Sequence, residues 1–343
     1  MQLFVNARFL TQPLTGVQRY GIEISRQIKK LCPDAVFLCP PDILHAGIAR
    51  ELGAKVAGRQ TGHFWEQADL PRYLGKSGAP LFSPGNTAPL IYKNNYVTVH
   101  DLAFRLYPQY NTRIFTAYYN WLVPRLCKRA TGVFTVSGTV REELVRELGV
   151  PRTKIGITYN GLPAGWLEHP PQTGPKEPLV LGIGTYSPRK NHHLLVQAFL
   201  ESALAKDHQL YLVGDRQEIF RSSGIRSHPR IRVLDRVTDT GLRELYARAR
   251  LAVSLSAYEG FGLPVLEGLY HGCRILCSDI PVYRELYSNY VYFCKVQNIR
   301  GISAALERTI VEDEAIVDPA FLFRQFSYEL SASIILEWLR SQT

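Results

Sequence analysis

The chain has 343 residues, of which 46% are hydrophobic and 20% are charged. This composition is typical of a folded globular protein and excludes a largely disordered one. The net charge of +10 lies in the first half, because residues 1–160 carry 20 Lys and Arg against 10 Asp and Glu, whereas residues 161–343 carry 20 of each. A basic half favours an anionic partner, although charge kept for solubility leaves the same pattern.

The length also indicates more than one folding unit, since 343 residues suggest two domains of about 150 residues each. No apolar run approaches the roughly 18–20 residues of a membrane span, and residues 1–10 lack the pattern of a signal peptide. The six cysteines show neither a CxxC pair nor the spacing of metal ligands. These features predict a cytoplasmic protein.

The first half alternates between strand-like and helical segments. A short strand at residues 2–5 precedes a loop and a helix from about Val17 to Leu31, where apolar residues recur at helical spacing. Further strand-like runs lie at residues 35–40, 80–84, 96–101 and 132–137, and helices are expected around 112–130 and 138–149. Continuous apolar runs that alternate with helices predict buried parallel strands with helices on both faces.

The same alternation begins again at residues 178–186 and continues to 273–279, after a linker-like segment, 160–178, that is rich in Pro and Gly. We therefore predict an N-terminal domain over residues 1–165 and a C-terminal domain over 166–325. The last segment, 326–343, is expected to form a helix that packs back on the N-terminal domain. Two such α/β domains would bind a ligand in the cleft between the carboxyl ends of their strands.

One stretch, "SAYEGFGLPVLEGLYHG" at residues 256–272, combines two glutamates with a glycine turn. Glycine lets the backbone approach a ligand closely, and Pro264 suits the first turn of a helix whose amides could face a phosphate. Glu267, about one turn into that helix, could accept hydrogen bonds from ribose hydroxyls, and Glu259 from sugar hydroxyls. A capped helix with one acid in its first turn is an equally good interpretation of these residues alone.

Three other loops contain candidate binding groups. Arg189 and Lys190, in "GTYSPRKNHH" (184–193), follow a strand, where cations could neutralise a departing diphosphate. The loop "PLTGVQRYG" (13–21) is a weaker phosphate-compatible candidate. His100, at the end of a strand, could bind a substrate hydroxyl or transfer a proton, and a structural role is equally open. No Asp-rich DxD motif is present, so we expect no metal.

The segment "RIFTAYYNWLVPRLCKRA" at residues 113–130 interleaves aromatic and basic side chains. Such a helix could lie at a membrane interface or pack its apolar residues on its own sheet. We expect core packing, with the basic residues free to face lipid. Pro124 is expected to bend or interrupt the helix.

These motifs together resemble glycosyltransferase family 4, a retaining GT-B family. "YEGFGLPVLEGLYHGCRILCSDIPVYREL" is similar to its signature of two glutamates separated by seven residues, and "LGIGTYSPRKN" is similar to its phosphate-binding loop. "TVHDLAF" resembles its N-domain His loop. "TGVQRYGIEI" and "HFWEQADLP" resemble the bacterial polysaccharide-assembly branch, many of whose members transfer mannose. The resemblance extends from about residue 3 to residue 340.

The resemblance implies a GT-B fold of two Rossmann-like α/β/α domains that face each other across a cleft. The first domain would bind the acceptor and the second the nucleotide sugar. Glu267 would bind the ribose, Glu259 the hydroxyls of the donor sugar, and Arg189 with Lys190 the diphosphate. The catalytic residues would be His100, Arg189, Lys190 and Glu259. The residues that bind the donor would be Gly16, Gly184, Arg189, Lys190, Glu259, Gly260, Phe261, Gly262, Leu263 and Glu267.

The implied reaction is a retaining transfer of a hexose, with mannose from GDP-mannose favoured, to a polyprenyl-diphosphate-linked or other anionic saccharide acceptor. The product would be a bacterial surface polysaccharide, made at the inner face of the cytoplasmic membrane by a peripheral enzyme that needs no metal cofactor and binds no nucleic acid. A nucleotide-sugar epimerase of the same fold and a non-catalytic nucleotide-sugar-binding protein are the alternatives. The sequence departs from the family at Thr185, where arginine is common, at Gly268, where alanine is common, and at Tyr270 and His271, which replace small residues.

Overall fold

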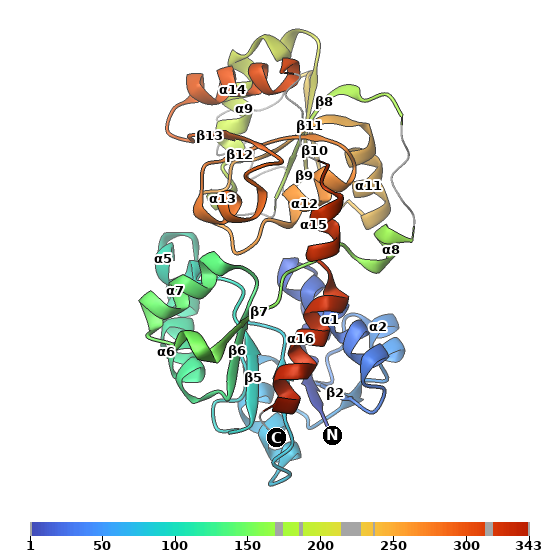
Figure 1. Cartoon of the computed structure of the whole chain (residues 1–343), viewed down its shortest axis with the longest axis vertical. Helices are drawn as coiled ribbons and strands as arrows, with labels where there is room; N and C mark the ends of the chain where they lie inside the picture. Colours follow the sequence, from blue (N-terminus) through green and yellow to red (C-terminus); the bar gives the residue numbers. More distant parts are fainter. Residues whose placement is uncertain are drawn as a thin grey trace. The chain divides into compact units, whose positions relative to one another are not determined.

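The computed structural model describes residues 2–168, 174–184, 188–213, 228–235, 237–312 and 318–341. The chain divides into unit 1, which comprises Met1–Pro163 and Gln325–Thr343, and unit 2, which comprises Ala164–Arg324 (Figure 1). Each unit is built on one parallel sheet with helices against it. The predicted class of two Rossmann-like α/β domains is confirmed. The sequence placed the division at residue 165 and the returning tail at 326, whereas the structure places them at Pro163 and Gln325.

Unit 1 contains a seven-stranded sheet in the order β3-β2-β1-β4-β5-β6-β7. Its strands are β1 (Phe4–Asn6), β2 (Val36–Cys39), β3 (Lys55–Val56), β4 (Leu81–Ser83), β5 (Asn95–Thr98), β6 (Gly132–Thr135) and β7 (Ile155–Ile157). Its longer helices are α1 (Gly16–Leu31), α2 (Ala46–Leu52), α6 (Arg113–Arg129), α7 (Gly138–Leu148) and α16 (Tyr328–Ser341). Its shorter turns are η1 (Arg8–Thr11), α3 (Gly62–Phe64), the π-helical η2 (Trp65–Asp69), α4 (Leu70–Leu74), α5 (Ala103–Leu106), η3 (Pro108–Tyr110) and η4 (Arg152–Lys154).

The alternation of side chains along β6 explains how helices cover both faces of this sheet. Val133 and its neighbours on one face form a buried cluster with residues of α6 and α7. Phe134 points to the opposite face, where the ring of Trp338 from α16 lies 5.6 Å from it. Small residues make room for that indole, since a Cβ on Gly156 would lie 3.3 Å from Trp338. The last helix of the chain therefore completes the core of unit 1.

Helix α6 continues without a break from Arg113 to Arg129 with Pro124 inside it, so the predicted interruption is wrong. Its neighbours Val123 and Leu126 are fully buried on the sheet, and this packing outweighs the one backbone hydrogen bond that proline cannot donate. The expected core packing holds for this inner face. Among the described residues, no helix is long and apolar enough to cross a membrane.

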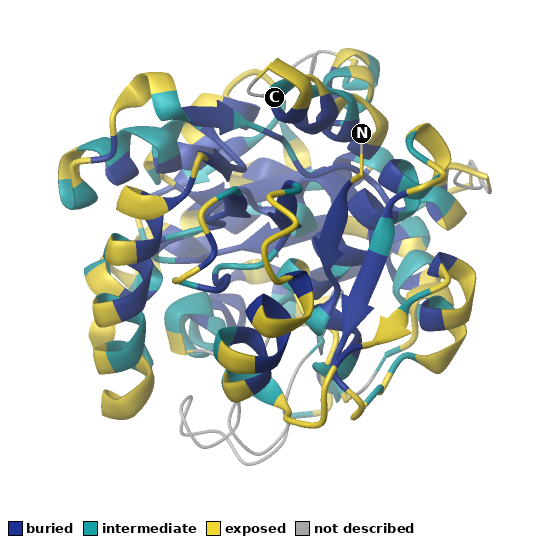
Figure 2. Cartoon of the chain, turned by 90° about the horizontal axis from the view of Figure 1, so that it is seen from below, coloured by how far each residue is buried: buried dark blue, intermediate teal, exposed yellow. Residues whose placement is uncertain are grey.

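Unit 2 contains a six-stranded sheet in the order β10-β9-β8-β11-β12-β13. Its strands are β8 (Glu177–Ile183), β9 (Gln209–Val213), β10 (Ile231–Leu234), β11 (Ala249–Ser254), β12 (Arg274–Ser278) and β13 (Tyr292–Cys294). Its helices are α8 (Ala164–Leu167), η5 (Pro188–Lys190), α9 (His192–Glu201), η6 (Ala203–Lys206), α11 (Asp239–Arg248), α12 (Leu263–Tyr270), α13 (Pro281–Tyr287), α14 (Ile299–Val311) and α15 (Ala320–Gln325). Most strands are buried, with β3 as an exposed exception, and the outward faces of the helices are exposed (Figure 2).

The strand order places a topological switch in each sheet. In unit 2, β8 lies between β9 and β11, so the chain leaves β8 toward one side and later returns on the other. In unit 1, β1 lies between β2 and β4 in the same way. Ligands of open parallel sheets bind at such points, at the carboxyl ends of the strands.

We predict that the substitution Ile335→Ala lowers the free energy of unfolding by about 2–4 kcal/mol, because Ile335 on α16 is 0% exposed and its loss leaves a cavity. Leu330→Ala on the same helix is the control, since Leu330 is 46% exposed. Urea denaturation of the full chain measures both. Equal effects of the two variants would contradict the assignment of α16 to the core.

Candidate active site

Two loops of unit 2 meet at its switch point. β8 leads through Gly184 toward η5 and α9, and the adjacent parallel strand β11 leads through residues 255–262 to α12. The amide of Ala257 donates a hydrogen bond of 2.9 Å to the carbonyl oxygen of Arg189. The side-chain amide of Asn191 donates one of 2.8 Å to the carbonyl oxygen of Leu255. These bonds fix the predicted phosphate loop against the loop that carries Glu259 and leads to the helix of Glu267.

The carboxylate of Glu259 lies among the predicted cations. Lys190 Nζ donates a hydrogen bond to its Oε1, and Arg189 Nη1 lies 3.7 Å from its Oε2. The guanidinium of Arg189 also donates to the carbonyl oxygen of Tyr258 and lies over the Tyr258 ring. Burial raises the pKa of Glu259, but the charges of Lys190 and Arg189 outweigh burial and hold that pKa below its usual value. Glu259 is therefore ionised at neutral pH.

Two backbone features place Lys190. A Cβ on Gly184 would lie 2.8 Å from His192 Nε2 and 3.0 Å from Lys190 Cγ, so only glycine fits there. Asn191 has a φ of 54°, and asparagine is among the few residues that adopt this conformation readily. Thr185, one of the departures from the family, lies outside the described residues.

The glycine turn at residues 260–262 packs against two tyrosines of α13. Gly262 has a φ of +94°, and a Cβ there would lie 2.3 Å from Cε1 of Tyr283. Tyr283 is buried, and its hydroxyl shares a hydrogen bond of 2.7 Å with Ser254 Oγ. The ring of Phe261 is buried beside Tyr287, with 6.1 Å between the ring centroids. A ligand at this turn would therefore contact the backbone of Phe261 and not its ring.

Glu267 projects from α12 and is held by a residue that the motifs did not reveal. The hydroxyl of Tyr246, on α11, donates a hydrogen bond of 2.9 Å to Glu267 Oε2. The Tyr246 ring stacks on His271, with centroids 5.5 Å apart, and His271 Nδ1 lies 3.0 Å from the carbonyl oxygen of Glu267. Tyr246 has no sequence signal beyond an apolar helical position, because only the fold brings α11 beside α12.

The unusual residues of α12 pack within unit 2. Tyr270 donates a hydrogen bond of 3.2 Å to the carbonyl oxygen of Trp166, and its ring lies 5.2 Å from that of Phe323. A Cβ on Gly268 would lie 2.6 Å from Cδ1 of Ile275, so glycine lets α12 approach β12 closely. Tyr270 and Gly268 therefore shape the core beneath the candidate site.

The remaining predicted residues lie in unit 1. His100 is buried beyond the end of β5, where its Nε2 is 2.8 Å from the carbonyl oxygen of Pro84 and its ring packs on Tyr20. Burial lowers the pKa of His100 below its usual value, which keeps the ring neutral at pH 7. Gly16 is exposed at the start of α1. The structure thus brings together the candidate residues of unit 2, and it places His100 and Gly16 in two loops of unit 1.

Metal binding finds no support in the part of the chain that the structure describes, which holds no group of three or more His, Cys, Asp or Glu side chains suited to a metal ion. The metal-independent reaction nevertheless stays a prediction. The cations beside Glu259 are the charges that could hold a diphosphate without a metal.

Comparison with known proteins assigns a family to each half of the chain. Residues 86–165 match the family model described as Glycosyltransferase Family 4, and residues 168–317 match that of Glycosyl transferases group 1. The chain is 25% identical to O-antigen chain mannosyltransferase RfbU of Salmonella typhimurium, over 98% of this chain and 99% of that protein. It is 28% identical to O-antigen chain mannosyltransferase B of Escherichia coli, over 77% of this chain and 73% of that protein.

A solved structure shows the same fold over the whole length. Anabaena Alr3699/HepE in complex with UDP-glucose superposes with a TM-score of 0.76, and the match covers 99% of each chain at 17% identity. At this identity the likeness establishes the fold alone, and it confirms the GT-B architecture expected from the sequence.

We predict that Gly262→Ala lowers the free energy of unfolding by about 2–4 kcal/mol, because it combines left-handed backbone strain with a clash against Tyr283. Gly272→Ala is the matched control: its φ is +67°, but no atom lies within 4 Å of a Cβ there. Urea denaturation measures both variants. If Gly272→Ala costs as much as Gly262→Ala, the contact with Tyr283 does not hold the turn.

Proposed function

This chain belongs to the glycosyltransferases of group 1 and Family 4, and on that premise we propose that it transfers mannose from GDP-mannose, with retention of configuration, to a lipid-linked saccharide. The observation that carries the proposal is the cluster of Lys190, Arg189 and Glu259 at the switch point of unit 2. A nucleotide sugar offers this cluster a diphosphate for its cations and hydroxyl groups for its carboxylate.

Binding of the donor would replace the ion pairs of Glu259 with Lys190 and Arg189 by contacts of all three side chains with the donor. Two cations face one carboxylate, so the cluster carries one excess positive charge toward a diphosphate. When the phosphates approach Lys190 and Arg189, Glu259 can accept hydrogen bonds from the hydroxyls of the sugar. The same cations would stabilise the negative charge that grows on the diphosphate as the glycosidic bond breaks.

Glu267 would bind the ribose. Tyr246 donates to one of its oxygens, which fixes the rotamer and the direction of the carboxylate. A buried carboxylate held in this way is preorganised to accept from vicinal hydroxyls. The predicted contact of His100 with the donor sugar remains a prediction.

The configuration of the donor sugar would be retained if the acceptor hydroxyl attacks its anomeric carbon on the same face that the diphosphate leaves. The leaving phosphate would accept the proton of that hydroxyl. Glu259 is poorly suited to act as a nucleophile, because Lys190 and Arg189 compensate its charge. Catalysis would then rest on the placement of the reactants and on stabilisation of the departing diphosphate.

The two curated relatives that carry the name O-antigen chain mannosyltransferase support mannose as the transferred sugar and a bacterial surface polysaccharide as the product. GDP-mannose is the donor that we infer from that sugar. The acceptor that we infer is a saccharide on a polyprenyl diphosphate at the inner face of the cytoplasmic membrane. A basic N-terminal half suits an anionic acceptor of this kind.

The outer face of α6 is the surface that we propose for membrane contact. Ile114 is 85% exposed and Trp121 is 48% exposed, and the guanidinium of Arg125 lies 5.2 Å from the Trp121 ring. The helix contains no acidic residue, and Lys128 and Arg129 are exposed in its last turn. Exposed apolar and aromatic side chains beside cations are suited to a peripheral contact with anionic headgroups.

We predict that Lys190→Ala and Glu267→Ala each reduce transfer at least about tenfold, equivalent to about 1.4 kcal/mol of transition-state stabilisation. Calorimetry with GDP-mannose, UDP-glucose and ADP-glucose identifies the donor, and a transfer assay then compares the variants. Lys206→Ala, an exposed lysine of unit 2, is the control. Normal turnover in Lys190→Ala, or epimerised sugar formed from the donor without an acceptor, would contradict the proposal.

We predict that the chain binds phosphatidylglycerol vesicles, that salt weakens this binding, and that Trp121→Asp weakens it by about tenfold or more. Leu44→Asp is the control, because Leu44 is 58% exposed in unit 1 but lies outside α6. Vesicle co-sedimentation with phosphatidylcholine as the neutral lipid measures the effect. Binding that resists salt, or that Leu44→Asp weakens equally, would rule out docking through α6.

A further inference from the structure

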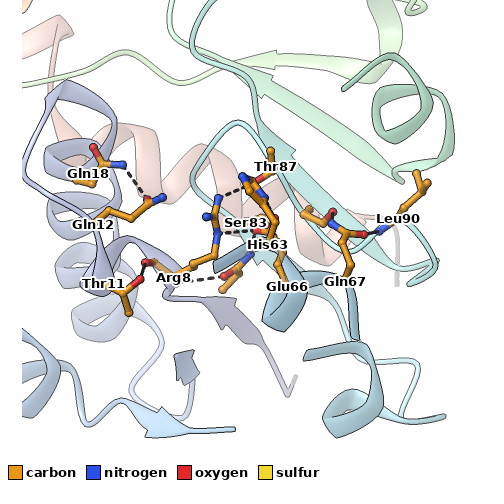
Figure 3. A network of polar contacts seen from close by, with 12 residues as sticks. Arg8, Thr11, Gln12, Gln18, His63, Glu66, Gln67, Ser83, Thr87 and Leu90 are labelled. Atoms are coloured by element: carbon orange, nitrogen blue, oxygen red, sulfur yellow. Dashed lines mark hydrogen bonds and ion pairs between the residues drawn. The ribbon is translucent and has the colours of Figure 1, made fainter. Parts of the chain in front are cut away.

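A second charged cluster lies at the switch point of unit 1. The loop after β1 supplies Arg8, the loop after β4 supplies Thr87, and the segment formed by α3 and η2 supplies His63 and Glu66 (Figure 3). β1 and β4 are adjacent and parallel, so their carboxyl ends lie at one edge of the sheet. The motif "HFWEQADLP" contributes His63 and Glu66. The transfer reaction proposed for unit 2 does not involve this motif.

The centre of this cluster is the carboxylate of Glu66, which is 1% exposed. Arg8 Nε lies 3.1 Å from its Oε1, and Asn6 Nδ2 donates to the same oxygen at 2.9 Å. Arg8 Nη2 donates to Thr87 Oγ1 at 2.8 Å. Burial raises the pKa of Glu66, but Arg8 and then His63 lower it to about 2, so the carboxylate is charged at neutral pH.

This arrangement is a costly way to stabilise a fold. The free-energy cost of removing two charges from water offsets most of the attraction between them. A buried ion pair such as Arg8–Glu66 therefore adds little to stability. Glu66 also lies on a π-helical turn, a conformation found frequently at functional sites. Charge, backbone conformation and position at the switch point favour a binding role for the cluster.

His63 and Tyr118 form the accessible side of the cluster. The side chain of His63 is 34% exposed, and its ring lies 4.7 Å from that of Tyr118 on α6. Within the described ranges, neither His63 Nε2 nor the Tyr118 hydroxyl has a hydrogen-bonding partner. Both groups are therefore available to a ligand.

The cluster sets the hydrogen-bonding character of these two groups. His63 Nδ1 lies 3.3 Å from Glu66 Oε2, so Nδ1 donates to that carboxylate and Nε2 is the ring nitrogen left for a ligand. Burial and then the charge of Glu66 raise the pKa of Tyr118 to about 12, so the phenol keeps its proton and donates. A ring nitrogen and a phenol donor beside aromatic faces match the hydroxyls and the apolar C–H face of a sugar ring.

The charges of Arg8 and Glu66 argue against an anionic ligand at this cluster. Glu66 neutralises Arg8, so the pair offers no excess positive charge to a phosphate. We propose that His63 and Tyr118, positioned by Glu66 and Arg8, bind a pyranose residue of the acceptor saccharide. This inference rests on the proposed glycosyl transfer and identifies where unit 1 holds its acceptor.

The substitution Tyr118→Phe tests the proposal, since it removes a hydroxyl that has no hydrogen-bonding partner among the described residues of unit 1. Saturation-transfer NMR of the full chain with methyl α-mannopyranoside and the methyl glycoside of N-acetylglucosamine measures sugar binding. Saturating GDP keeps the donor site of unit 2 occupied. We expect Tyr118→Phe to weaken sugar binding about fivefold, the effect of one neutral hydrogen bond, with GDP affinity unchanged.

Tyr73→Phe is the matched control, because Tyr73 is 50% exposed on α4 of the same unit and lies outside the cluster. His63→Gln is the second variant, and we expect it to weaken sugar binding as well. Unaltered binding in Tyr118→Phe, no binding of either glycoside to the wild type, or displacement of the sugar by inorganic phosphate would each overturn the proposal. Because the measurement requires no turnover, an absence of transferase activity would refute the proposed function separately.

Discussion

The carboxylate of Glu259 can remain charged in a buried position only because Lys190 and Arg189 lie beside it. This compensation governs the surrounding structure. Gly184 leaves room for the Lys190 side chain, and Asn191 accepts a left-handed backbone so that η5 can turn into α9. Without the two cations, burial would favour the protonated form of Glu259, which could not take the role proposed for the ionised carboxylate.

The sheet of unit 1 repeats this electrostatic arrangement at its own switch point. Glu66 is buried and ionised beside Arg8, as Glu259 is beside Lys190 and Arg189. The difference between the two clusters is the balance of charge. Unit 2 has one cation in excess, which suits a diphosphate, whereas the Arg8–Glu66 pair is neutral and suits uncharged hydroxyls. The two proposed binding sites thus differ in chemistry according to the charges that their loops supply.

Helix α6 shows how one element can serve the core and the surface together. Its inner face carries the buried Val123 and Leu126, and its outer face carries Ile114 and Trp121 beside basic residues. Tyr118 lies between the two faces and reaches His63. The core packing predicted from the interleaved aromatic and basic pattern is confirmed for the inner face, and membrane contact of the outer face stays a proposal.

The sequence was sufficient for the features that depend on neighbouring residues. Apolar runs and their alternation with helices predicted two parallel α/β units, and the order of motifs identified the family and the loop-helix segment that carries Glu259 and Glu267. The need for glycine at position 262 was also visible as a turn signal. The spacing of apolar residues and the residue types of a turn depend only on neighbouring positions, so they can be identified in the sequence itself.

Contacts between distant segments could be identified only in the tertiary structure. Tyr246 holds Glu267 from another helix, and His63 and Tyr118 meet although 54 residues separate them in the sequence and no motif joins them. Pro124 predicted a bend or an interruption, and α6 packs on the sheet without an interruption. Which side chains share a pocket, and which charges compensate one another in it, depends on strand order and burial. Neither is encoded in the spacing of residues along the chain, because a protonation state and a contact are set by all the elements packed around a group.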